Sequence, residues 1–192
     1  NRLLFIVSSP MSVCARGSSV RVPRSARSCV PAITAIYRHH VLHGTGTFET
    51  EAPSLNDMAT RRQDVLAKQL PWLVAEDDSG SVLGFAYANW FKPRPAFRFS
   101  AEDSIYVADH ARGQGIGRLL LAALCSECEA AGVRKLIAVI GDSANAGSIG
   151  VHRNAGFRHV GVLSNVGWKF NQWLDVVMME KTLGAGARSS PE

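Results

Sequence analysis

Residues 104–120 read Ser-Ile-Tyr-Val-Ala-Asp-His-Ala-Arg-Gly-Gln-Gly-Ile-Gly-Arg-Leu-Leu, and this stretch decides the fold. The alternation of Ile105 and Val107 is typical of a strand. The apolar residues Ile116, Leu120 and Leu124 then follow at helical spacing. A glycine-rich turn joins the two patterns, so the stretch predicts a strand, a loop and the start of a helix.

The glycines of this turn indicate a phosphate site. Gly113, Gly115 and Gly117 can take positive φ and let an anion approach the backbone. The free N–H groups and the dipole of the following helix favour negative charge at the same place. Spacing excludes two common phosphate loops. The nucleoside-triphosphate loop needs Gly-Lys-Ser/Thr, but Arg118 and Leu119 follow Gly117, and the dinucleotide loop needs glycine where Arg118 stands.

Composition limits the class of protein. The chain has 192 residues, 46% hydrophobic and 19% charged, which fits a single globular domain with a full core. Its net charge of +5 comes from residues 1–30, which hold five arginines and no acid, while the other 16 Lys and Arg equal the 16 Asp and Glu. A nucleic-acid partner is therefore not predicted. No apolar run approaches the roughly 18 residues that span a bilayer, so no membrane partner is predicted either.

Two groups of possible metal ligands occur in the sequence, but neither is good evidence for a metal site. Cys125 and Cys128 form a Cys-x-x-Cys inside the helix after the glycine turn, but no second pair supplies further zinc ligands. His39, His40 and His43 lie near the end of an earlier helix, where histidines usually interact with the helix dipole or with solvent. We therefore predict no metal site, buried thiols and a cytoplasmic location, with which the few cysteines are consistent.

The whole chain predicts one α/β domain with a mixed sheet of about six or seven strands and about four helices. We assign residues 19–183 to this domain, residues 1–18 to an N-terminal extension and residues 184–192 to a tail. The extension fits a transit peptide, sequence upstream of a start at Met11, or a disordered tail, and it is a poor signal peptide. Strands are expected at about 19–22, 72–76, 82–90, 97–108, 135–140, 157–164 and 173–181. Helices are expected at about 29–42, 54–69, 115–131 and 145–154.

The segment Arg112-Gly-Gln-Gly-Ile-Gly117 resembles the pyrophosphate loop of the Gcn5-related N-acetyltransferase (GNAT) superfamily, Arg/Gln-x-x-Gly-x-Gly/Ala. Taken alone, it also fits a plain tight turn before a helix. Further stretches are similar to the phosphinothricin and methionine-sulfoximine acetyltransferase branch. They are Ala35-Ile-Tyr37, Gly46-Thr-Phe48, Trp72-Leu-Val-Ala75, Phe97-Arg98, Ala101-Glu102, Ser104-Ile-Tyr-Val107, Asn145, Ser148, His152, Gly156-Phe157, Gly167-Trp-Lys-Phe170 and Trp173-Leu-Asp175. Arg27, Cys29 and Asn171-Gln172 depart from the pattern of that branch, and the last pair leaves the substrate in doubt.

The resemblance implies that the sheet opens at an acetyl-coenzyme A site and that acetyl-coenzyme A is a co-substrate. The cofactor-binding residues it implies are Tyr106, Val107, Arg112, Gly113, Gln114, Gly115, Ile116, Gly117, Arg118, Asn145, Ser148 and His152. Asn145 is explained nearly as well by helix capping.

Three catalytic roles follow from the resemblance. Glu102 is expected to be the general base, although it also fits a surface acid paired with Arg98 or Arg94. The backbone N–H of Val107 is expected to stabilise the oxyanion. His152 stands where many relatives have the tyrosine that protonates the coenzyme thiolate, and an imidazole can give that proton.

The acceptor is expected to be the amine of a small amino acid analogue such as phosphinothricin, methionine sulfoximine or methionine sulfone, acetylated directly in a ternary complex. Arg98 suits its carboxylate or phosphinate. The other substrate residues expected are Ser100, Glu102, Phe48 and Phe170. Alternatives are another amine, such as a polyamine or a protein N-terminus, and a non-catalytic acyl-coenzyme A sensor. The resemblance also implies a homodimer with the site near the interface.

Overall fold

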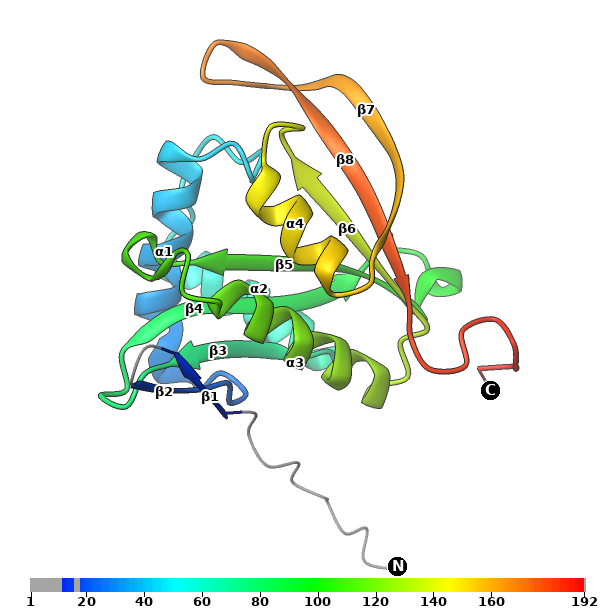
Figure 1. The fold of residues 1–192 in the computed structure, drawn as a ribbon, viewed down its shortest axis with the longest axis horizontal. Helices are drawn as coiled ribbons and strands as arrows, with labels where there is room; N and C mark the ends of the chain where they lie inside the picture. The colour runs from blue at the N-terminus through cyan, green and yellow to red at the C-terminus, as the bar shows by residue number, and fades with distance from the viewer. Residues whose placement is uncertain (1–11, 16–17, 192) are drawn as a thin grey trace, which may run out of the picture.

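A mixed sheet of eight strands, in the order β1-β2-β3-β4-β5-β6-β8-β7, organises the computed structural model, which describes residues 12–15 and 18–191 (Figure 1). The strands are β1 (Ser12–Ala15), β2 (Ser18–Arg21), β3 (Trp72–Glu76), β4 (Val82–Trp90), β5 (Ser100–Val107), β6 (Lys135–Gly141), β7 (Arg158–Lys169) and β8 (Gln172–Thr182). The helices are α1 (Val30–His43), α2 (Leu55–Ala67), α3 (Ile116–Ala130) and α4 (Ala146–Asn154). The predicted α/β class is confirmed. The sheet has one strand more than the six or seven predicted, because β1 pairs with β2 at the sheet edge.

Helices cover both faces of the sheet. In Figure 1, α3 and α4 lie in front of the strands, and α1 and α2 pack on the other side. Trp72, Phe85, Leu120 and Leu124 are fully buried between these layers. Burial of such side chains contributes roughly 1.5–3 kcal/mol each, so the central strands form a stable support for the loops at their ends.

The predicted strand 97–108 starts too early. Pro95–Phe97 form a short 3-10 turn, and β5 begins only at Ser100. Pro95 suits the first position of such a turn, and the N–H groups of Phe97 and Arg98 donate within it, to the carbonyls of Arg94 and Pro95, so these two residues cannot join the strand ladder. The last two strands, in contrast, extend further than predicted, and they meet in a tight turn where Phe170 and Asn171 have positive φ.

The central strands separate part-way along their length. β5 and β6 are parallel and paired from Ser100 with Lys135 to Asp103 with Ala138. Beyond that point β5 remains paired with β4, and β6 with β8. Figure 1 shows β6 diverging from β5, with α4 beside the fork. We call this place the β5–β6 fork, and it is the opening that the resemblance implied.

The described part of the chain, residues 12–15 and 18–191, contains no helix with the length and apolarity required to cross a bilayer.

Candidate functional site

A cavity of about 940 Å³ occupies the β5–β6 fork. Its walls come from β5, the glycine turn, the start of α4, the end of α1 and the irregular segment after α1. The predicted cofactor residues that line it are Tyr106, Val107, Arg112, Gly113, Gly115, Ile116, Gly117, Arg118, Asn145, Ser148 and His152. Gln114 does not line it, because its side-chain amide turns back and donates to the carbonyl of His110 at 2.9 Å.

The glycine turn exposes helix amides to this cavity. Gly113 and Gly115 have φ of 72° and 83°, in the left-handed region that favours glycine. Gly115 is the N-cap of α3, and the N–H of Leu119 is the first to bond back, to the carbonyl of Gly115 at 3.1 Å. The amides of residues 116–118 therefore project from the helix end, where they and the helix dipole can bind an anion.

β5 directs backbone groups into the fork. The N–H of Ala108 donates to the carbonyl of Leu83 on the β4 side at 2.8 Å. Because bonded residues alternate along an antiparallel pair, the amide of Val107 faces away from β4 and into the fork. The carbonyl of Val107 accepts a hydrogen bond from His40 Nε2 at 2.9 Å. This corrects the expectation that His40 is a solvated residue or a dipole partner: it lines the cavity, and burial lowers its pKa.

Glu102 lies on β5, four residues before Tyr106, and lines the same cavity. Burial raises the pKa of its carboxyl, and the nearby charge of Asp103 adds to this, while Lys92 acts in the opposite direction. A carboxyl group with a raised pKa is a stronger base than an ordinary surface glutamate, so the position and the environment of Glu102 suit proton removal from an ammonium.

His152 is buried against a carboxylate that sequence reasoning missed. Its Nε2 lies 2.8 Å from Oδ2 of Asp103, and its Nδ1 lies 2.8 Å from the carbonyl of Ser148. The side chains of His152 and Asp103 are 5% and 2% exposed. Because a carbonyl can only accept, Nδ1 carries a proton, and one further proton is shared between Nε2 and Asp103. Burial alone would lower the pKa of His152, but the hydrogen bond and charge of Asp103 raise it overall.

Asp103 also has an unused acceptor. Its Oδ1 is buried and has no hydrogen-bond partner among the described residues, and Asp103 lines the cavity. A buried carboxylate oxygen without a donor is costly, so this atom favours a bound molecule that can donate to it.

The opposite wall of the cavity is residues 44–49, which we call the 44–49 loop. Glu49 forms a two-pronged ion pair with Arg61 of α2, at 2.5 and 3.0 Å. Thr47 bonds through its hydroxyl to Tyr37 at 3.1 Å. Phe48, a predicted substrate residue, belongs to this wall and faces the same cavity as Glu102.

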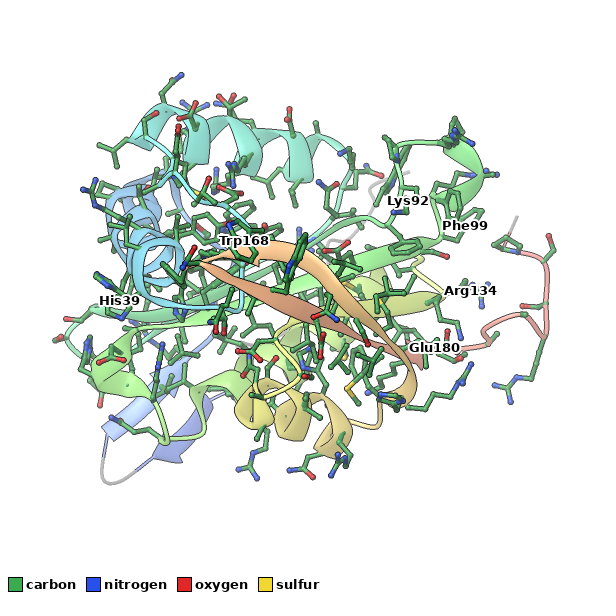
Figure 2. The ribbon with its side chains drawn as sticks, turned by 90° about the horizontal axis from the view of Figure 1, so that it is seen from above. His39, Lys92, Phe99, Arg134, Trp168 and Glu180 are labelled. Atoms are coloured by element: carbon green, nitrogen blue, oxygen red, sulfur yellow. The ribbon has the colours of Figure 1, made fainter. Side chains whose placement is uncertain are left out.

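Three predicted substrate residues are not part of the cavity: Arg98, Ser100 and Phe170. Arg98 follows the 3-10 turn before β5, where its guanidinium donates to the carbonyl of Pro95 at 3.1 Å and lies over the ring of Phe99. Figure 2 shows Phe99 at the end of the molecule opposite His39. The charged residues that affect the pKa of Glu102 are Asp103 and Lys92.

Sequence reasoning missed four residues: Asp103, His40 and Tyr87, which line the cavity, and Lys169, which contacts the 44–49 loop from outside it. Asp103 could have been flagged, since an acid on a strand leading to a phosphate loop is costly to bury without a role. The other three gave no signal, because their place depends on contacts between segments far apart in the chain.

The geometry defines a coenzyme-type site: helix amides for a diphosphate at one end, a long cavity between two strands, and a carboxyl group with raised pKa at the other. A model of the "Acetyltransferase (GNAT) family" matches residues 34–157, and the chain belongs to that family.

Three proteins of known name are similar to this chain. The chain is 49% identical over 174 residues to a phosphinothricin N-acetyltransferase of Alcaligenes faecalis, covering 91% of this chain and 87% of that protein. It is 42% identical over 166 residues to an L-methionine sulfoximine/L-methionine sulfone acetyltransferase of Pseudomonas aeruginosa, covering 84% and 93%. The crystal structure of a phosphinothricin acetyltransferase from Sinorhizobium meliloti in complex with acetyl-coenzyme A superposes with a TM-score of 0.87 and 40% identity, covering 90% and 93%.

Proposed function

We propose that this protein is an N-acetyltransferase that uses acetyl-coenzyme A to acetylate the amino group of a small amino acid analogue of the phosphinothricin or methionine sulfoximine type. One observation carries the proposal: a single cavity has the amides of residues 116–118 at one end and Glu102 at the other. The similarity to enzymes named for these substrates supports the acceptor class.

The residues present fit acetyl-coenzyme A. Gly113 and Gly115 leave open space where other residues would carry a side chain, so a diphosphate can reach the amides behind them. Arg112 and Arg118 add positive charge at the same end. When bound, the coenzyme supplies an acetyl thioester, which an uncharged amine can attack.

Glu102 takes the proton that the acceptor ammonium must lose before it can attack. The N–H of Val107, directed into the fork, stabilises the negative charge that develops on the acetyl oxygen. The departing thiolate requires a proton. Both ring nitrogens of His152 are bonded, so the Asp103–His152 pair, next to the cavity, gives this proton when the bond between Nε2 and Asp103 opens. No covalent acetyl-enzyme is needed: Cys125 and Cys128 are buried, and burial raises the pKa of both thiols.

We also propose that the protein is a cytoplasmic homodimer that associates through the β7–β8 hairpin. β7 is an edge strand of the sheet, and such edges invite pairing with another strand. The hairpin exposes the large apolar residues Val160, Val162, Leu163, Val166, Trp168, Phe170 and Trp173. In Figure 2 the hairpin, with Trp168, crosses in front of the rest of the sheet. A patch of this kind indicates a protein interface, and a second copy of the chain presents the same edge and the same apolar residues.

A turnover screen tests the function. The purified protein is incubated with acetyl-coenzyme A and one acceptor at a time, and both thiol release and the acetylated product are measured. The acceptors are phosphinothricin, methionine sulfoximine, methionine sulfone, ordinary amino acids, a polyamine and a peptide with a free N-terminus. We expect the first three to give the highest kcat/KM. A preference for the polyamine or the peptide would show that the proposed acceptor class is wrong. Coenzyme binding without any acetylation would identify the protein as a sensor.

A further inference from the structure

The 44–49 loop has no regular secondary structure, so its position depends on contacts from other elements. The most unusual of these comes from Lys169, near the end of β7. Lys169 is only 4% exposed, although lysine is rarely buried. Its ammonium donates to two backbone carbonyls of the loop, those of Gly44 at 2.8 Å and Thr47 at 2.7 Å.

The neighbouring residue on the same side of the strand contacts the loop as well. A side chain at Gly167 would place its Cβ 2.0 Å from the Phe48 ring, so the ring lies directly against the backbone of β7. Side chains alternate along a strand, and Trp168 accordingly is exposed on the opposite side. One face of β7 therefore contacts the wall of the cavity, and the other face is open to a partner.

Two of the three protons of the buried ammonium are bonded in this contact, and the nitrogen also lies 4.9 Å from the centre of the Phe170 ring. Transfer of a charged lysine from water is costly unless its protons are bonded, and two carbonyls of the loop supply that bonding. The contact also stabilises the two loop carbonyls, because the loop is not part of a helix or a sheet. Nothing in the proposed chemistry requires the amine of Lys169, and it is not among the residues that line the cavity.

We propose that Lys169 is a positioning residue for the acceptor: with Gly167 it fixes the 44–49 loop, and thereby sets where Phe48 and Glu49 stand opposite Glu102. The role of the loop in acceptor binding rests on the proposed function. The role of Lys169 in fixing the loop rests on the observed contacts alone. The coenzyme end of the cavity is formed by the glycine turn and the start of α3.

The test compares Lys169→Met with a matched control, Lys135→Met. Lys135 also bonds two oxygens, those of Glu180 at 3.1 Å and Thr182 at 3.0 Å, but at the far end of β6. Amide hydrogen exchange is measured over residues 44–49, together with the KM for acceptor and for acetyl-coenzyme A. In Lys169→Met we expect exchange in the loop and the acceptor KM to rise about tenfold, while the acetyl-coenzyme A KM changes less than about twofold. Lys135→Met should leave all three near wild type.

A second variant, Gly167→Ala, keeps the lysine and displaces the Phe48 ring. It tests whether β7 positions the 44–49 loop if Lys169→Met does not fold. It should raise the acceptor KM and leave the acetyl-coenzyme A KM unchanged. The proposal is wrong if loop exchange in Lys169→Met equals that of Lys135→Met, or if both KM values rise together in the folded variants. If the wild type acetylates no acceptor, the proposed function fails, and the exchange measurement still decides whether Lys169 holds the loop.

Discussion

His152 Nε2 lies 2.8 Å from Asp103 Oδ2, and this contact joins α4 to β5 directly beside the β5–β6 fork. The other imidazole nitrogen donates to the Ser148 carbonyl, so both ring nitrogens are bonded. The sequence predicted His152 as an isolated proton donor. In the structure it shares its proton with a buried carboxylate, and the two residues must be considered as one unit.

The first prediction concerns the pH dependence of that unit. Asp103 raises the pKa of His152 against the effect of burial, so the imidazole keeps its proton to a higher pH than an unpaired histidine. If the protonated ring serves the leaving thiolate, kcat should fall only as pH rises through this raised pKa. In Asp103→Asn the charge of Asp103 is lost and only the hydrogen bond to Ser148 still opposes burial, so the pKa of His152 should fall and the alkaline fall in kcat should move to lower pH by about one unit or more.

Asp175→Asn is the control for this profile. Asp175 is a carboxylate bonded to Ser143 and Asn165, outside the cavity. Its variant should keep the wild-type profile. Identical profiles for wild type and Asp103→Asn would show that Asp103 does not set the protonation of His152.

The second prediction concerns Glu102. A base acts only when deprotonated, and because the pKa of Glu102 is raised, activity should fall as pH drops through a value above that of an ordinary glutamate. Glu102→Gln should lower kcat by about 10²–10⁴ and remove this acidic fall, with acetyl-coenzyme A affinity unchanged. Steady-state kinetics across pH, with calorimetric titration of the coenzyme, measures both. A kcat within about twofold of wild type would assign the base to another group.

The third prediction separates backbone strain from coenzyme binding. Gly115 and Gly80 have φ of 83° and 81°, and neither has an atom within 4 Å of where a Cβ would stand. Alanine at either position should therefore cost a similar free energy of unfolding, about 1–2 kcal/mol. Only Gly115→Ala should weaken acetyl-coenzyme A binding, by about tenfold or more, because only Gly115 begins the helix whose amides meet the diphosphate. Equal acetyl-coenzyme A affinities for the two variants would show that the glycine turn does not bind the diphosphate.

The fourth prediction concerns assembly. Trp173 is 60% exposed on the β7–β8 hairpin, and its ring lies 5.2 Å from that of Trp168. Trp173→Glu should convert a dimer into a monomer in sedimentation velocity, because a carboxylate cannot be buried unpaired in an apolar interface. Leu55→Glu, at a residue 54% exposed on α2, should remain dimeric. A wild type that is monomeric throughout the concentration range would contradict the interface.

Much of the fold could be predicted from the sequence because its signals are local. The alternation before Val107, the glycine turn and the apolar spacing after Ile116 each specify their own backbone, and the structure confirms all three. The turn at Gly80 between β3 and β4 is equally local. The start of β5 was missed because Phe97, Phe99 and Ala101 alternate as they would in a strand, although a 3-10 turn occupies residues 95–97.

The site could be predicted only in part. The glycine turn, Glu102 and Phe48 lie together at one cavity, as the resemblance implied. The partner of His152 could not be predicted, because Asp103 is 49 residues away in the chain and meets it only through the packing of α4 beside the fork. The placement of Arg98 depends in the same way on a turn whose shape the prolines decide.

The most direct test of the central claim is a crystal structure of the protein grown with acetyl-coenzyme A. We expect the diphosphate on the amides of residues 113–118, the pantetheine arm along the β5–β6 fork, and the acetyl group between the Val107 N–H and Glu102. A coenzyme bound elsewhere, or an acetyl group remote from Glu102 and Val107, would contradict the account.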